Sequence, residues 1–212
     1  MTSIRTNVCV VGGGPAGLLI GLLLAKREVD VILLEAHETF DREFRGEVLQ
    51  SSTAHLLDEL GFLEYILAQP HSSLTEGLIR IRGKTAGEFS FSTIVPEYPY
   101  AIWMPPPIFL QALAEKAAPF GSFQCWMGAR ASELIETAGK IAGVHGRRHG
   151  EEPFEVRADV VVGADGRSSS MRRLRHFEIE YEYHATSSGL SSSSRQTGQI
   201  PSTSRSGQMY RA

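Results

Sequence analysis

Residues 8–17 read VCVVGGGPAG and are the most informative segment of this chain about its fold. Four small apolar residues run directly into three glycines, a pattern typical of a buried parallel strand that ends in a tight turn. Pro15 suits the first turn of a helix, and the apolar run that follows predicts a helix over 16–27. A second apolar run predicts a buried strand at 31–34. Strand, glycine turn, helix and strand in this order form the βαβ unit of a doubly wound sheet.

The glycine turn carries a dinucleotide-binding fingerprint. Gly12, Gly14 and Gly17 fit the spacing G-x-G-x-x-G, with Pro15 and Ala16 between the last two. The first glycine permits the turn, the second lets a pyrophosphate approach the backbone, and the third lets the helix pack close to the sheet. Main-chain N–H groups at a helix N-terminus attract the phosphates. The predicted strand before the turn and the predicted helix after it strengthen this interpretation.

An acidic residue closes the unit. Glu35, with Ala36 beside it, follows the second predicted strand and lies where an acid accepts hydrogen bonds from adenosine ribose hydroxyls and repels a 2′-phosphate. This position favours FAD or NAD over NADP. The alternative is an ordinary surface glutamate at the end of a strand.

The rest of the chain predicts an α/β, Rossmann-like FAD/NAD(P)-binding domain, whose doubly wound parallel sheet is interrupted by an antiparallel β-meander. Apolar periodicity predicts helices at 53–60, 63–68 and 108–118 and strands at 78–82, 88–94, 98–104 and 123–127. The meander is predicted at 131–137, 141–147 and 154–156, before a buried strand at 159–162.

Two further motifs resemble a known family. GADGRSSSMR at 163–172 and FRGEVLQ at 44–50 are similar to motifs of the para-hydroxybenzoate hydroxylase-like FAD monooxygenases, and the resemblance extends over residues 4 to about 180. It implies that Arg45 contacts the flavin cofactor and that Asp165 lies near the FAD pyrophosphate. Gly166 and Arg130 complete the predicted cofactor-binding set. Taken alone, Arg45 is equally a solvated arginine, and Asp165 the start of an ordinary turn.

The resemblance implies an oxidoreductase that uses FAD, NADH or NADPH, and O₂ to hydroxylate an aromatic or related small molecule. The domain is expected to cover residues 1–183, with partial substrate-domain strands around 74–104. Pro106 or Pro107 stands where many relatives have glutamine or arginine, and proline cannot supply that donor. No side chain is predicted as the catalytic acid or base.

Residues 184–212 are rich in serine and threonine and are predicted to be disordered. Family members continue instead with a substrate-covering sheet and a second Gly-Asp flavin motif. The sequence is therefore interpreted as a truncated hydroxylase, from a frameshift or a fragmentary gene. Two alternatives remain open, namely an inactive FAD-binding module and the NAD-binding domain of another oxidoreductase.

Composition excludes several classes. The formal net charge of −3 gives no basic field for nucleic acid. Glycines interrupt the apolar stretch after Arg5, which argues against a signal peptide and a membrane span and favours the cytoplasm. Two cysteines give no disulfide framework, and Cys9 is expected in a buried strand. No metal site is predicted from His145 and His149. The oligomeric state stays open.

Overall fold

The computed structural model describes residues 2–41, 48–149 and 152–177. Its main sheet has six strands in the order β8-β2-β1-β11-β10-β9. The first four of these are mutually parallel, and β10 pairs antiparallel with both of its neighbours, β11 and β9. This arrangement confirms the predicted α/β class with an antiparallel meander. The strands are β1 (Thr2–Val11), β2 (Val31–Leu34), β8 (Phe123–Trp126), β9 (Ala129–Thr137), β10 (Lys140–Arg148) and β11 (Glu152–Gly163).

The predicted βαβ unit is confirmed. β1 leads through the glycine turn into α1 (Pro15–Ala25), and Pro15 stands in the first turn of that helix. The end of β1 pairs in parallel with β2 on one side and with the end of β11 on the other. Cys9 is completely buried in β1, as its apolar context predicted. The carboxyl ends of three parallel strands therefore meet beside the glycine turn.

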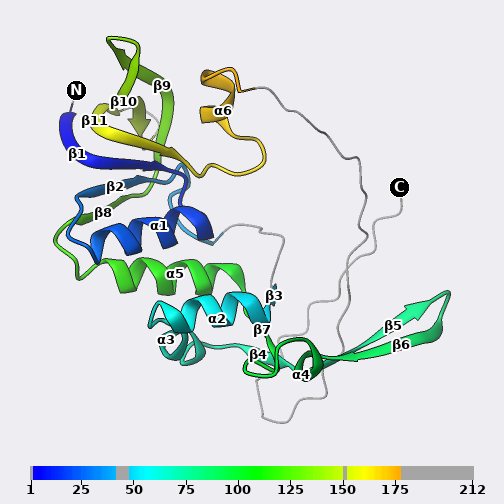
Figure 1. Cartoon of the computed structure of the whole chain (residues 1–212). Helices are drawn as coiled ribbons and strands as arrows, with labels where there is room; N and C mark the ends of the chain where they lie inside the picture. The colour runs from blue at the N-terminus through cyan, green and yellow to red at the C-terminus, as the bar shows by residue number, and fades with distance from the viewer. Residues whose placement is uncertain (1, 42–47, 150–151, 178–212) are drawn as a thin grey trace. The chain divides into compact units, whose positions relative to one another are not determined.

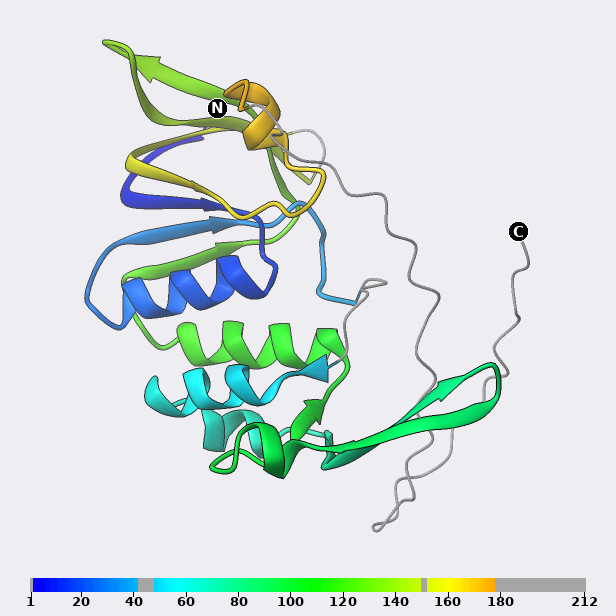
Figure 2. The ribbon, with the colours of Figure 1, turned by 45° about the vertical axis from the view of Figure 1, so that its right-hand side comes forward.

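Helices cover one face of this sheet. α1 lies against the sheet, and α5 (Pro106–Ala117) packs on the side of α1 that faces away from the sheet (Figures 1 and 2). α2 (Ser51–Glu59) and α3 (Leu63–Leu67) follow on the far side of α5 (Figure 1). The opposite face of β1 and β2 is covered by residues of the meander, including Val144 and Phe154, which form a second apolar core. Thus α1 is buried between two layers, which explains why its sequence is apolar on every side.

One strand replaces two that were predicted separately. The segments 154–156 and 159–162 belong to the continuous strand β11. Its first half pairs with β10, and residues 154–163 pair with β1. The prediction that 159–162 is buried was wrong, since Val160 is 52% exposed. Within the described residues, the last part of β11 pairs with β1 alone, so its outer edge has no covering strand.

Two smaller sheets lie between α1 and α5 in the sequence. β3 (Val48–Leu49), β7 (Ala101–Trp103) and β4 (Ser72–Leu74) form one, and β5 (Glu76–Ile81) and β6 (Lys84–Ser90) form a hairpin. The prediction of a strand through residue 94 was wrong, because Ser90 caps a helical turn, α4 (Phe91–Ile94). The strand predicted at 98–104 is only three residues long, because it pairs only across 101–103.

Some predictions fall outside this description. Arg45 and the segment 184–212 are not among the described residues. Among those that are described, no helix is both long and apolar enough to cross a membrane.

Candidate functional site

The glycine turn is shaped by the chain that crosses it. Gly12 has φ +111°, and a β carbon there would lie 2.5 Å from the carbonyl oxygen of Ala164. A β carbon on Gly17 would overlap the carbonyl oxygen of Gly12. Ordinary side chains cannot occupy either position, because van der Waals contact begins near 3.4 Å. The fold itself therefore requires glycine at the first and third positions of the fingerprint.

Gly14 has a different environment. Its φ is −78°, which any residue can adopt, and a β carbon there would meet no atom of the described residues within 4 Å. Gly14 begins α1 as its N-cap without a side-chain cap, and the first turn, Pro15 and Ala16, contains no acidic residue. The N-terminus of this 11-residue helix therefore carries neither a capping side chain nor an acidic residue of its own first turn, which favours an anion there. This N-terminus is where a pyrophosphate would approach the backbone, so the residues fit the predicted group.

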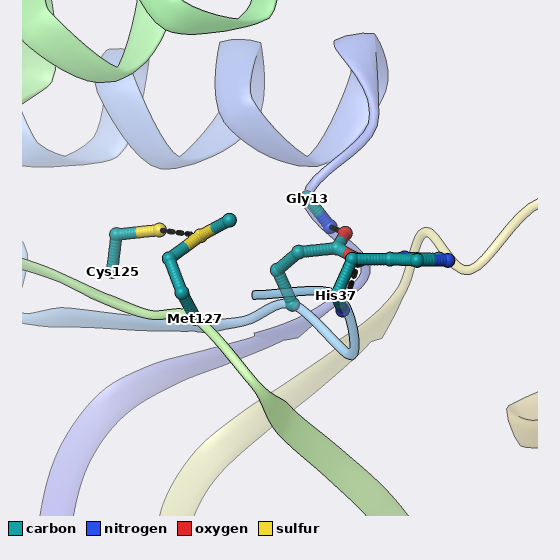
Figure 3. Close-up of polar contacts among 5 residues, drawn as sticks. Gly13, His37, Cys125 and Met127 are labelled. Carbon is teal, nitrogen blue, oxygen red and sulfur yellow. Dashed lines mark hydrogen bonds and ion pairs between the residues drawn. The ribbon is translucent and has the colours of Figure 1, made fainter. Parts of the chain in front are cut away.

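Glu35 lies against the same turn. It is 3% exposed, and one carboxylate oxygen accepts the main-chain N–H of Gly13 at 2.7 Å. The other oxygen accepts the main-chain N–H of His37 at 2.9 Å and contacts its ring Nδ1 at 2.6 Å (Figure 3). A β carbon on Gly13 would lie 2.8 Å from the carboxylate, so only glycine admits this approach. The alternative of a solvated surface glutamate is therefore wrong.

A pair of sulfur atoms lies close to this carboxylate. Cys125 Sγ lies 3.6 Å from Met127 Sδ, beside Gly13 and His37 in the same close-up (Figure 3). Burial raises the pKa of the Cys125 thiol to about 11, the negative charge of Glu35 adds to this effect, and Arg148 opposes it. A thiol with such a pKa stays protonated at neutral pH and is a poor nucleophile. Both side chains pack against the apolar core, so the pair has a packing role rather than a reactive one.

Neighbouring strands bring Ala36 and Arg130 to the same edge. The main-chain N–H of Glu35 bonds to the carbonyl of Trp126, and that of Ala129 bonds to the carbonyl of Glu35. Ala36 is half-buried directly after this ladder, whereas Arg130 is exposed at the start of β9. Because Ala129 is buried, alternation along the strand turns Arg130 away from the core. Both residues border the edge that Glu35 occupies.

Asp165 is the N-terminal anchor of a short helix. Its carboxylate accepts the Ser169 hydroxyl and the N–H of Ser170, each at 2.5 Å, at the start of α6 (Ser170–Leu174). The N–H of Met171 adds a third bond at 3.1 Å. Gly166, with φ +78°, allows the turn that folds the carboxylate back onto the helix. The motif thus has a structural role in the described chain, close to the glycine turn through the bond from Ala164 N–H to Val11 carbonyl.

A groove opens on the other side of Asp165. It has a volume of about 430 Å³ and lies between α6 and the exposed end of β11. Asp165 and Gly166 border it, but the glycine turn and Glu35 do not. It is lined by Leu134, Ile141, Val161, Gly163, Asp165, Gly166, Ser169, Met171, Arg172, Arg175 and Phe177.

The family is shown by a direct match. A model of the FAD binding domain, FAD_binding_3, matches residues 5–203. The chain belongs to this FAD-binding domain family. Its membership confirms the family predicted from the three motifs, and FAD is the cofactor that defines the family.

Relatives of this FAD-binding domain include more than one activity. This chain is 37% identical over 170 residues to 6-methylpretetramide 4-monooxygenase of Streptomyces rimosus, and the match covers 80% of this chain and 40% of that protein. It is 30% identical over 168 residues to digeranylgeranylglycerophospholipid reductase of Methanocella arvoryzae, covering 79% and 41%. The p-nitrophenol 4-monooxygenase PnpA of Pseudomonas putida has the same fold, with a TM-score of 0.72 at 23% identity over 81% and 43%. The chain spans less than half the length of each.

Two residues of the FAD-binding domain were missed in the sequence. Gly13 and His37 contact Glu35, yet the fingerprint leaves its second position unspecified and places no requirement two residues beyond the acid. The triple glycine was the available signal for Gly13. Nothing in the sequence indicated that the His37 ring turns back onto the carboxylate. Pro106 begins α5, so the flavin contact expected there in relatives has no donor from this residue.

Proposed function

We propose that this chain is the FAD-binding region of a flavin-dependent monooxygenase that hydroxylates an aromatic or related small molecule. NADH or NADPH is the proposed reductant, and O₂ the oxidant. The single observation that carries the FAD site is the contrast within the glycine turn. Gly12 and Gly17 are required by the fold, whereas Gly14 is required by no neighbouring atom and faces open space. The preference for glycine at an N-cap is moderate, and the close approach of a ligand is the second physical reason for glycine at that position.

The proposed roles follow from position. Gly12, Gly14, Pro15, Ala16 and Gly17 would hold the pyrophosphate at the N-terminus of α1. Glu35 would accept the ribose hydroxyls, with Ala36 and Arg130 beside the adenosine. Asp165 and Gly166 would support the loop next to the pyrophosphate. Arg45, outside the described residues, is proposed to contact the flavin, by resemblance alone.

FAD would supply the redox chemistry when bound, and the chain's residues would bind and orient it. Hydroxylation rather than reduction is proposed because the chain is 37% identical to the monooxygenase of Streptomyces rimosus and 30% identical to the reductase of Methanocella arvoryzae. The name 6-methylpretetramide 4-monooxygenase gives that relative a small organic substrate, which supports a substrate of the same kind here.

The test begins with the purified 212-residue chain, incubated with excess FAD and desalted. A retained flavin spectrum is expected, and Gly14→Ala should reduce the retained FAD without unfolding the chain. NADH and NADPH oxidation under air, with and without phenolic substrates, follows. Retained FAD without oxidation would favour the inactive module, and binding of NAD without FAD would favour the NAD-binding alternative.

A further inference from the structure

The side chain of His37 returns to the acid that precedes it by two residues. Its main-chain N–H and its ring Nδ1 both contact one oxygen of Glu35, at 2.9 Å and 2.6 Å, while Gly13 N–H holds the other oxygen. We assign the hydrogen in this contact to Nδ1, because an ionised carboxylate only accepts hydrogen bonds. The ring is therefore a third N–H donor to a carboxylate that is nearly buried.

We propose that His37 is a positioning residue for Glu35, which it holds in the orientation that selects a dinucleotide with a free ribose 2′-hydroxyl. The inference rests on the proposed FAD site and adds a selectivity determinant to it. Glu35 can exclude a 2′-phosphate only while its negative charge stays at the ribose position. A glutamate free to rotate would relieve the repulsion by turning away.

Three contacts oppose that rotation. Gly13 is buried, and turning the carboxylate away would leave its N–H without this acceptor, which is unfavourable for a buried donor. The charge-assisted bond from the His37 ring is the shortest of the three, and such bonds are the strong ones. The main-chain N–H of His37 remains whatever side chain stands there. Removing the ring therefore weakens the hold on one oxygen and leaves the glycine turn intact.

Asparagine and alanine separate the hydrogen bond from the bulk of the ring. The Asn side-chain amide can donate from a position close to that of Nδ1, whereas Ala has no donor. His55→Ala is the matched control, because His55 is equally exposed, at 54% against 53%, and also faces a glutamate, Glu59 at 3.5 Å. It lies on α2, outside the proposed site.

Calorimetry would compare the binding of ADP-ribose and 2′-phospho-ADP-ribose to wild-type chain, His37→Ala, His37→Asn and His55→Ala. The wild type is expected to prefer ADP-ribose by about tenfold or more, and His37→Ala to lose about fivefold or more of that preference. His37→Asn and His55→Ala should retain it. An unchanged preference in His37→Ala, or an equal loss in His37→Asn, would overturn the inference.

A second measurement needs no ligand. Hydrogen exchange at the Gly13 amide should be faster in His37→Ala than in wild type and should return to the wild-type rate in His37→Asn. Unchanged exchange together with unchanged selectivity would remove any positioning role. A wild-type chain that binds neither ADP-ribose nor FAD, but shows the expected exchange pattern, would contradict the proposed function while preserving the contact between His37 and Glu35.

Discussion

A β carbon placed on Gly12 would lie 2.8 Å from the α carbon of Asp165, so two motifs far apart in the sequence touch in the structure. The contact arises because β11 runs parallel to β1 and ends at the same edge of the sheet. The loop from Ala164 then crosses directly over the glycine turn. The second motif thereby imposes the glycine requirement on the first.

Replacing Gly12 by alanine should destabilise the chain strongly. The positive φ alone costs about 1–3 kcal/mol, and the overlap with Ala164 adds to this strain. Urea unfolding followed by circular dichroism would measure the loss. Gly61→Ala is the matched control, because Gly61 has φ +74° but open space around it, so it carries the backbone strain alone. An equal loss in both variants would show that the crossing loop moves aside without cost.

Gly14→Ala should separate binding from stability. The position has ordinary backbone angles and no neighbouring atom among the described residues, so the free energy of unfolding should fall by only about 1 kcal/mol, the cost of alanine at an N-cap. A methyl group over the helix N-terminus should weaken FAD binding by about tenfold or more, because it occupies the approach of the pyrophosphate. Fluorescence titration of FAD with each variant would test this. Equal affinity in the wild type and the variant would place the phosphates elsewhere.

Asp165→Ala should cost about 1–3 kcal/mol, the usual penalty for leaving buried donors without their acceptor, although Ser169 remains the N-cap of α6. The carboxylate accepts three donors at the start of α6, and alanine leaves all of them without it. Asp159→Ala is a suitable control, because Asp159 pairs with an exposed Arg5 and such surface pairs contribute less than about 1 kcal/mol. Chemical denaturation of both variants would give the two values. A smaller loss at Asp165 than at Asp159 would show that the carboxylate of Asp165 does not anchor the start of α6.

Cys125 should react slowly in the folded chain. Its pKa is about 11, so at pH 8 the folded chain holds a thiol rather than the reactive thiolate. Labelling with a disulfide reagent should be slow at pH 8, accelerate as the pH approaches 11, and become rapid after unfolding in urea. Fast labelling of the native chain at pH 8 would show that the sulfur pair is exposed.

The same shift links stability to pH. Cys125 in the unfolded chain loses its proton near pH 9, whereas the folded chain retains it up to about pH 11. The unfolded state then binds fewer protons, so this contribution to stability is complete below pH 9 and is lost as the pH rises toward 11. Unfolding free energies at pH 8 and pH 10.5 should therefore differ less in Cys125→Ala than in the wild type. Equal differences would exclude the linkage.

The sequence by itself determined the βαβ unit, the glycine fingerprint, the acid after the second strand and the family. These features depend on local periodicity and on residues with special backbone freedom, which short segments reveal. The different environments of the three glycines became visible in the folded chain. Gly12 and Gly17 are crowded by neighbouring backbone, whereas Gly14 has no neighbour among the described residues. The difference depends on atoms that are remote in the sequence but close in space. The tertiary structure also decided that β11 is one strand with an exposed end and that His37 turns back onto Glu35. Long-range strand pairing sets the first, and the rotamer of His37 and the conformation of the loop after β2 set the second, neither of which is recorded by periodicity within a segment.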